Sequence, residues 1–318
     1  MATTHSLTIL RTRLAAAAAA VALIGCDRTP QATRSFDGDA ALAYARQQVE
    51  FGPRVPGSEG HARMAAWLDS LLRTRADSVV VQRWTHVTRG GDTLPLVNIL
   101  ASFNPAATQR ILFLAHWDTR PGSDGPAAAP ADSAKPVPGA NDGASGVAVL
   151  LGVADALDSV PPGIGVDLLF VDGEDYGDFF AEGRPDVLIG SRYYAQNQLA
   201  PAPLYAVLFD MVGDRDLRIS REGNSVIGAP EVVDLVWRVA AEAGYENIFV
   251  PFEGTTATDD HVELQRVGIR AIDLIDFSYG PGNGWWHSPE DTMDKISAES
   301  LGIVGDVALR LVQEAEGE

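Results

Sequence analysis

The chain has 318 residues, 46% of them hydrophobic and 21% charged, a composition that excludes an intrinsically disordered or collagen-like protein. Its formal net charge of −19 argues against nucleic acid or anionic lipid as a partner, because phosphates would be repelled. The single cysteine excludes both an intramolecular disulfide and a multi-cysteine zinc site, so any metal must be bound by His, Asp and Glu.

The N-terminal segment has the pattern of a secretory signal. Arg11 and Arg13 precede an alanine-rich apolar run that is too short for a stable membrane anchor. The run ends in Leu-Ile-Gly-Cys, which resembles a bacterial lipobox and implies cleavage before Cys26 and lipidation of that residue. A buried N-terminal helix is the alternative. We expect a signal peptide over 1–25, the lipidated cysteine and a polar tether over 26–35, and export to the periplasmic or cell-surface side, with the lipid as the only membrane contact.

Helical and strand-like patterns alternate through the rest of the chain. In chain order, they predict helices over 37–49 and 59–74, strands over 78–87, 94–102 and 110–115, a surface loop over 120–138, a helix over 144–158, a strand over 166–171, a helix over 190–198, a strand over 204–210, a helix over 230–243, strands over 247–250 and 270–275, and a helix over 297–315. This rhythm predicts an α/β fold, a three-layer α/β/α sandwich around a mostly parallel mixed sheet. One catalytic-size domain over 36–318 accounts for all of it.

Polar residues follow three of the predicted strands directly. ILFLA precedes His116, Trp117 and Asp118; DLLFV precedes the run 172–175; and YAVLF precedes Asp210. Ligands of open α/β sheets bind outside the carboxyl ends of the strands. These side chains are therefore candidates for one site.

Three other segments carry the same residue types: the loop 139–146 with Asp142, the run 258–261, and the run 285–287. Each alone is explained by a helix cap, a surface pair or a solvated acid. Together they predict a cluster at one sheet edge, and clustered carboxylates persist only around a cation or by sharing protons. Zinc held by one His and two carboxylates, with one open position, makes a hydrolytic or acyl-transfer site.

A series of motifs in this order carries a family resemblance: FGPRVPGS, AHWDTRP, GANDGASG, FVDGEDYG, LFDMVG, TDDH and WWHSPEDTMDKIS. The series covers nearly all of 36–318 and resembles the zinc-dependent peptidases of the M28 family, which includes leucyl and other aminopeptidases. More closely, it resembles an offshoot of that family, the animal-type glutaminyl cyclases and their bacterial lipoprotein relatives.

The resemblance implies a metal site. Asp142, Asp175 and His287 match the ligands of one zinc ion, although relatives often carry Glu where this chain has Asp175. In aminopeptidases, the residues matching His116 and Asp210 hold a second zinc and the one matching Asp142 bridges both ions. Because all five residues are present, the ligand set leaves both one and two metals open.

The resemblance also implies catalytic residues, with Glu174 as the general base. Two departures from the aminopeptidases favour a cyclase. Asp259 stands where aminopeptidases typically carry Ser, and in cyclases that Asp hydrogen-bonds the base and the equivalent of Asp210. Trp286 precedes the ligand His287, and in cyclases this indole lines the substrate pocket; a core aromatic is the alternative for Trp286.

The expected activity is glutaminyl-peptide cyclotransfer, the conversion of N-terminal glutamine of peptides or proteins to pyroglutamate with release of ammonia. One Zn²⁺ per chain would polarise the side-chain amide, and Glu174 would shuttle the proton. The alternative is a di-zinc aminopeptidase of the M28 type. A third class, a non-catalytic binding protein, would be expected to lack one or more of these ligands.

Overall fold

The computed structural model describes Met1, Ala2 and residues 33–317, and the chain from Thr33 onward forms one compact unit. The expected lipobox and Cys26 lie outside the described residues. Among the helices of the described part, none has the length and apolarity that a membrane crossing needs.

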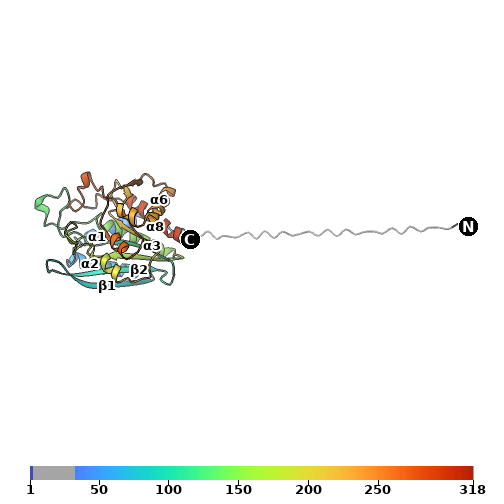
Figure 1. The fold of residues 1–318 in the computed structure, drawn as a ribbon, viewed down its shortest axis with the longest axis horizontal. Helices are drawn as coiled ribbons and strands as arrows, with labels where there is room; N and C mark the ends of the chain where they lie inside the picture. Colours follow the sequence, from blue (N-terminus) through green and yellow to red (C-terminus); the bar gives the residue numbers. More distant parts are fainter. Residues whose placement is uncertain (3–32, 318) are drawn as a thin grey trace. The chain divides into compact units, whose positions relative to one another are not determined.

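The centre of this unit is a six-stranded mixed sheet with the strand order β1-β2-β4-β3-β5-β8 (Figure 1). The strands are β1 (Ser78–Val87), β2 (Thr93–Phe103), β3 (Arg110–His116), β4 (Gly165–Val171), β5 (Ala206–Asp210) and β8 (Ala271–Ile275). β4, β3, β5 and β8 run parallel, whereas β1 and β2 are antiparallel to their neighbours at one edge. The carboxyl ends of four strands therefore meet at one edge of the sheet.

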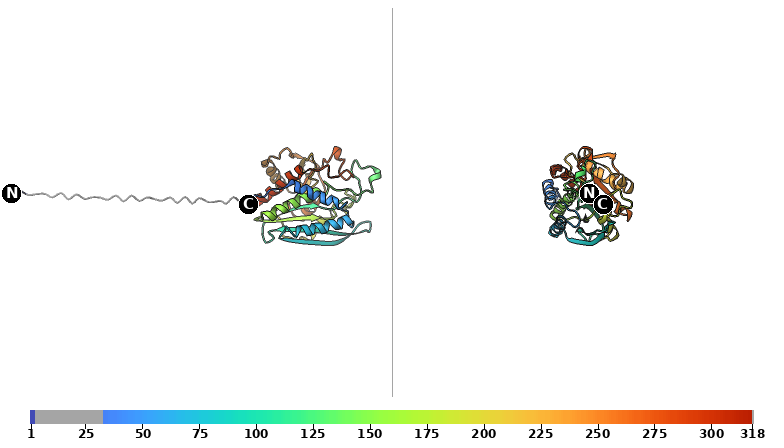
Figure 2. Two further views of the ribbon diagram at one scale, coloured as in Figure 1. Left: turned by 180° about the vertical axis from the view of Figure 1, so that it is seen from behind. Right: turned by 90° about the vertical axis from the view of Figure 1, so that its left-hand side faces the viewer.

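Helices cover both faces of the sheet. They are α1 (Gly38–Glu50), α2 (Glu59–Leu72), α3 (Ala144–Ser159), α4 (Ile189–Gln196), α5 (Gly223–Gly228), α6 (Pro230–Glu242), α7 (Asp260–Arg266) and α8 (Ala298–Gly317). Side chains alternate along β3, as strand geometry requires. Ile111 and Phe113 join a core with α1, α2, α3, α6 and α8, while Leu112 and Leu114 join a second core with α4 and α7. The left view of Figure 2 shows α1, α2 and α3, coloured blue to green, in front of the strands. The expected α/β/α sandwich is confirmed.

Helix α3 lies directly against the sheet and begins at the edge where the strands end. Nearly all of its residues are buried. At Gly146 a Cβ would overlap the carbonyl oxygen of Phe209, so only glycine permits this close approach of the helix to β5. The approach places Asp142, two residues before the helix, near the end of β5.

The region after β5 differs from the expectation. β7 (Phe249–Glu253) pairs with β6 (Ile219–Arg221) in a separate two-stranded sheet and not with the central one. The sequence patterns predicted neither β6 nor the short helices α5 and α7. These elements have three to seven residues, too few to show a clear periodicity.

Arg34, which lies before α1, ties the start of the compact unit to α8. Its guanidinium donates hydrogen bonds to Glu316 at 2.7 and 2.9 Å and to the carbonyl oxygens of Val160 and Pro161. Burial would raise the pKa of Glu316, but hydrogen bonds from Arg34 and from the Gly163 amide outweigh burial and lower it. Residues 33–35, expected in the tether, are thus part of the compact unit.

We expect Arg34→Gln to lower the free energy of unfolding at neutral pH by about 1–3 kcal/mol, because charged hydrogen bonds to Glu316 are lost. The folded-state pKa of Glu316 is depressed, so its contribution is present above the unfolded pKa of about 4.3 and is lost as the pH falls through the folded pKa. Urea unfolding should therefore show a difference between wild type and variant that shrinks in acid. Arg46→Gln, at an exposed position of α1, is the control, and equal stability of Arg34→Gln and wild type at neutral pH would contradict the prediction.

Candidate metal centre and active site

The structure gathers the predicted residues at the carboxyl edge of the sheet. His116 and Asp210 are the last residues of β3 and β5, and Glu174 and Asp175 lie in the turn that follows β4. Asp142 precedes α3, where Gly143 adopts φ +94° and turns the chain into the helix. All five of these side chains are buried, as is His287, which follows the 3₁₀ turn η2 (Pro281–Asn283).

Asp142, Asp175 and His287 form one group that could hold a metal ion. Each offers a ligand atom, and these atoms lie within 4.8 Å of one another. His287 Nε2 is 3.2 Å from Asp175 Oδ1 and 3.6 Å from Asp142 Oδ2. His287 adopts φ +51°, a strained conformation for a residue with a Cβ, and such strain is often found at functional sites.

Two residues of the loop after β3 hold this group in place. His287 Nδ1 donates to Asp124 Oδ1 at 2.9 Å, which fixes the ring and directs Nε2 toward Asp142 and Asp175. Arg120 donates to Asp175 Oδ1 at 2.8 Å and also pairs with Asp124. Zinc-binding histidines almost always have such an outer partner. Asp124 lies in 120–138, which the sequence predicts as a surface loop, and it is not among the predicted site residues because no local pattern links it to His287.

His116, Asp142 and Asp210 form a second candidate group. His116 Nε2 is 3.1 Å from Asp210 Oδ1 and 3.2 Å from Asp142 Oδ1, so Asp142 belongs to both groups through different oxygens. The other ring nitrogen, His116 Nδ1, is buried and has no hydrogen-bond partner in the described part of the chain. Its nearest carboxylate oxygens, on Asp118 and Glu174, are 3.7 and 3.9 Å away.

The pKa shifts of the ligand groups indicate that a cation would be favourable at this position. Burial and the charge of Asp175 raise the pKa of Asp142. Burial alone would lower the pKa of His287, but Asp175, Asp124 and Asp142 outweigh it and raise the pKa to about 9. A divalent cation would offset the repulsion between the carboxylates of Asp142 and Asp175. One imidazole nitrogen with two carboxylate oxygens is a set of ligands that zinc accepts. The residues therefore fit zinc.

Three further carboxyl groups line the cavity beside the ligands: Glu174, Asp210 and Asp259. Burial raises the pKa of Glu174 well above its usual range, and the charges of Asp259 and Asp175 add to this effect. Burial and the charge of Asp210 do the same for Asp259, which also caps α7 by accepting from the Asp260 amide at 2.6 Å. Carboxyls packed this closely share protons.

The cavity has a volume of about 280 Å³ and an aromatic wall. Trp286 stacks on His287 with 3.7 Å between ring centroids, and Phe277 lies 5.0 Å from Trp286. Phe179 and Phe180 line the same space. Trp286 is therefore a partly exposed wall of the cavity as well as a packed aromatic.

Other residues of the same motifs face elsewhere. Asp172 accepts from His61 Nε2 at 2.9 Å and belongs to neither ligand group. Asp260 accepts from the Ser191 hydroxyl, and His261 Nε2 lies 3.2 Å from Glu222 Oε2. Of the Asp-Asp-His run, only Asp259 lines the cavity.

Replacing Asp124 by Asn should weaken zinc binding by about 10- to 100-fold, because His287 loses the carboxylate that orients it. Asp132→Asn is the matched control, since Asp132 lies in the same loop and pairs with Lys135 at 2.6 Å. Competition with a zinc chelator measures both affinities. Equal affinities for wild type and Asp124→Asn would show that His287 needs no such partner.

Comparison with known proteins gives a family. Residues 98–312 match the model of peptidase family M28. A segment of 192 residues is 31% identical to aminopeptidase YwaD of Bacillus subtilis; it covers 58% of this chain and only 39% of that protein, so the match spans well under two thirds of that relative.

Two solved structures match along nearly their whole length. A zinc-dependent exopeptidase of Parabacteroides distasonis has a TM-score of 0.84 and 35% identity, with 88% of this chain and 99% of the other covered. The glutaminyl cyclase of Bacteroides thetaiotaomicron has a TM-score of 0.83 and 36% identity, with the same coverage of 88% and 99%. The neighbours are thus divided between peptidases and cyclases at similar identity. With the family model matching more than half of its length and two buried ligand groups at the sheet edge, this chain belongs to peptidase family M28.

Proposed function

We propose that this protein is a zinc-dependent glutaminyl-peptide cyclotransferase, which converts the N-terminal glutamine of peptides or proteins to pyroglutamate and releases ammonia. The observation that carries the proposal is the difference between the two histidines. His287 Nδ1 donates to the Asp124 carboxylate at 2.9 Å, as is typical of a zinc ligand, whereas the nearest carboxylate oxygen to His116 Nδ1, on Asp118, is 3.7 Å away. This difference supports one metal position, formed by Asp142, Asp175 and His287.

One metal suffices for cyclisation, because nucleophile and electrophile belong to the same residue. The α-amine nitrogen of the N-terminal glutamine attacks its own side-chain amide carbon, a five-membered ring forms, and the amide nitrogen leaves as ammonia. No activated water takes part. Bound zinc would supply a Lewis acid that polarises the amide carbonyl.

The proton transfers fall to the chain's own carboxyls. Glu174 would take a proton from the attacking amine and return it to the departing nitrogen. Its raised pKa suits both tasks, because the group must bind and release a proton near neutrality. Asp259, when charged, would keep the pKa of Glu174 high, and Asp210 does the same for Asp259, so the three carboxyls would share a proton. Trp286 would cover the folded-back substrate and exclude water.

A di-zinc aminopeptidase is the second candidate, and one specific observation favours it. The group of His116, Asp142 and Asp210 offers a second set of ligand atoms within 4.8 Å of one another. In that enzyme Glu174 would instead activate a water molecule to cleave the first peptide bond. A non-catalytic binding role has less support, because every ligand expected of an enzyme is present.

The lipobox-like sequence at Cys26 supports a place for this reaction outside the cytoplasm, at a membrane surface. Glutaminyl peptides or proteins that pass through that compartment would then be the substrates. Both the anchor and the location are part of the proposal.

Metal stoichiometry separates the two enzyme classes. We expect one tightly bound zinc ion per chain. His287→Ala removes the only nitrogen ligand of its group and should abolish zinc binding, whereas His116→Ala should retain the metal. Elemental analysis of the purified protein and both variants measures this. Two zinc ions per chain, one of them lost with His116→Ala, would instead establish the aminopeptidase arrangement.

The purified protein should release ammonia from a glutaminyl peptide with a free N-terminus and hardly hydrolyse leucyl or alanyl anilides. Glu174→Gln keeps the size of the side chain but cannot carry a proton, so turnover should fall by about 10²- to 10⁴-fold with zinc retained. Glu59→Gln, an exposed glutamate of α2, is the control. Release of free N-terminal amino acids by wild type, with no pyroglutamate formed, refutes the proposal.

A further inference from the structure

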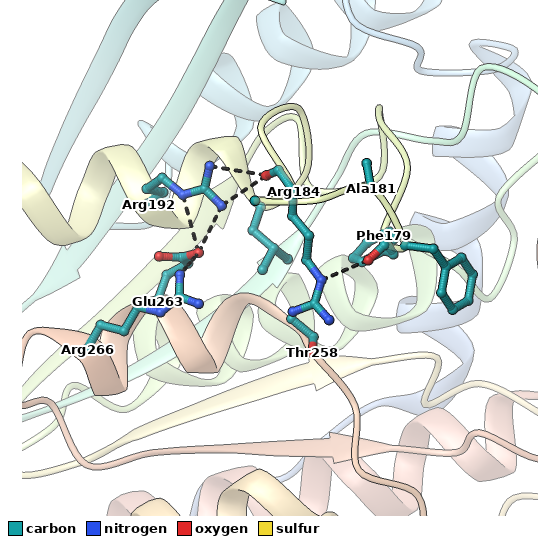
Figure 3. Close-up of a pocket in the computed structure, with 10 residues that line it drawn as sticks. Phe179, Ala181, Arg184, Arg192, Thr258, Glu263 and Arg266 are labelled. Carbon is teal, nitrogen blue, oxygen red and sulfur yellow. Dashed lines mark hydrogen bonds and ion pairs between the residues drawn. The ribbon is translucent and has the colours of Figure 1, made fainter. Parts of the chain in front are cut away.

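A second cavity of about 380 Å³ adjoins the one that holds the candidate active site. The two share Phe179, Phe180, Arg184 and Thr258 as lining residues, so a peptide that extends from the first cavity over this wall would enter the second. Figure 3 shows the residues that line the second cavity. Its size lies within the range of about 300–1,000 Å³ that is usual for ligand sites. Phe180 on the shared wall is 93% exposed, which leaves an aromatic face free for contact with a bound chain.

The lining of this second cavity is basic although the protein is strongly acidic. Arg184, Arg192 and Arg266 line it together with Glu263, and we call these three arginines and their cavity the arginine pocket. Glu263 is only 4% exposed and pairs with Arg192 at 3.0 Å and with Arg266 at 2.5 Å. One carboxylate cannot neutralise three guanidinium groups, so the lining keeps an excess of positive charge in a chain of net charge −19.

Arg184 has spare donors, and so does Arg266, which donates to Glu263 through Nη1 alone. The Nε of Arg184 donates to the Phe179 carbonyl oxygen at 2.7 Å, and within the described residues its two terminal nitrogens donate to no acceptor. Figure 3 shows this guanidinium beside Thr258, on the wall common to both cavities. Arg192 supports the backbone of Arg184 by donating to its carbonyl oxygen at 3.3 and 3.4 Å. The guanidinium of Arg184 is therefore positioned and has donors left for a ligand.

We infer that the arginine pocket binds a carboxylate of the substrate peptide, a few residues after its N-terminus, and so selects acidic glutaminyl peptides. The inference rests on the proposed function, which places the first residue between the zinc ligands and Trp286. An extended peptide advances about 3.3 Å per residue, so the residues that follow the first would pass over the shared wall. A planar guanidinium with two free amino groups matches a carboxylate in a bidentate pair. The carboxylate comes from an Asp or Glu side chain or from the C-terminus of a short peptide.

The zinc-loaded wild type tests this with matched peptides whose turnover is followed by ammonia release. Gln-Ala-Glu-amide and Gln-Glu-Ala-amide carry a side-chain carboxylate, Gln-Ala-Gln-amide carries none, and Gln-Ala-Gln with a free C-terminus carries only the terminal one. We expect the KM of the carboxylate peptides to be lower by about 3- to 20-fold, with kcat little changed, because the pocket contributes binding remote from the reacting atoms. The preference should weaken as salt is raised, since the pocket is open to solvent.

The variants locate the effect. Arg184→Gln should remove the preference, and Arg184→Lys should keep part of it because a charge without the planar fork remains. Arg46→Gln, at an exposed position of α1, should behave like wild type.

Each outcome decides between the inference and the proposed function. Equal kcat/KM of the wild type for acidic and neutral peptides overturns the inference but not the proposed function. This comparison uses the wild type alone, so it does not depend on whether a variant folds. A preference that survives in a folded, zinc-loaded Arg184→Gln overturns it as well. No ammonia release from any of these peptides overturns the proposed function, and the inference falls with it.

Discussion

The mutual repulsion of buried carboxylates is the constraint on which the rest of this structure depends. Asp142, Asp175, Asp210, Glu174 and Asp259 are all nearly excluded from water. Four of them line one cavity, and Asp175 lies beside Asp142 in a candidate ligand group. Burial and mutual charge raise the pKa values of three of them, Asp142, Glu174 and Asp259, so the group is costly unless protons are shared or a cation is bound. A bound zinc ion would offset the repulsion between these carboxylates, and this gain would contribute to the free energy of metal binding.

The carboxylates are held from outside by hydrogen bonds to the backbone that carries them. Asp118 accepts from the amides of Glu174 and Asp175 at 3.0 and 3.1 Å. Asp291 does the same for the amides of Asn141 and Asp142 at 2.8 and 3.1 Å. These two acceptors bind main-chain amides and therefore use none of the side-chain oxygens of Asp142 or Asp175. The backbone that carries these side chains is therefore already in position, and little rearrangement of the site is needed during the reaction.

The two adjoining cavities have opposite electrostatic character. The first cavity is lined by acidic groups and aromatic rings, whereas the adjoining arginine pocket, formed by Arg184, Arg192 and Arg266, is basic. The acidic cavity suits the protonated amine of an incoming N-terminus, and the basic one suits a carboxylate further along. The proposed cyclase would thus prefer peptides with a positive N-terminus and a negative group a few residues later.

The α/β fold and most residues of the candidate metal centre follow from the sequence pattern alone. Apolar strands that run directly into His116, Asp210 and the turn with Asp175 must deliver these residues to one edge, because parallel strands end together. Which partners meet at that edge depends on long-range contacts that the sequence pattern does not predict. Asp124 contacts a histidine 163 positions away, and the arginine pocket joins the loop after β4 to helices α4 and α7. Periodicity records local burial, whereas such pairings depend on how irregular loops return to the sheet, and those paths leave no periodic signal.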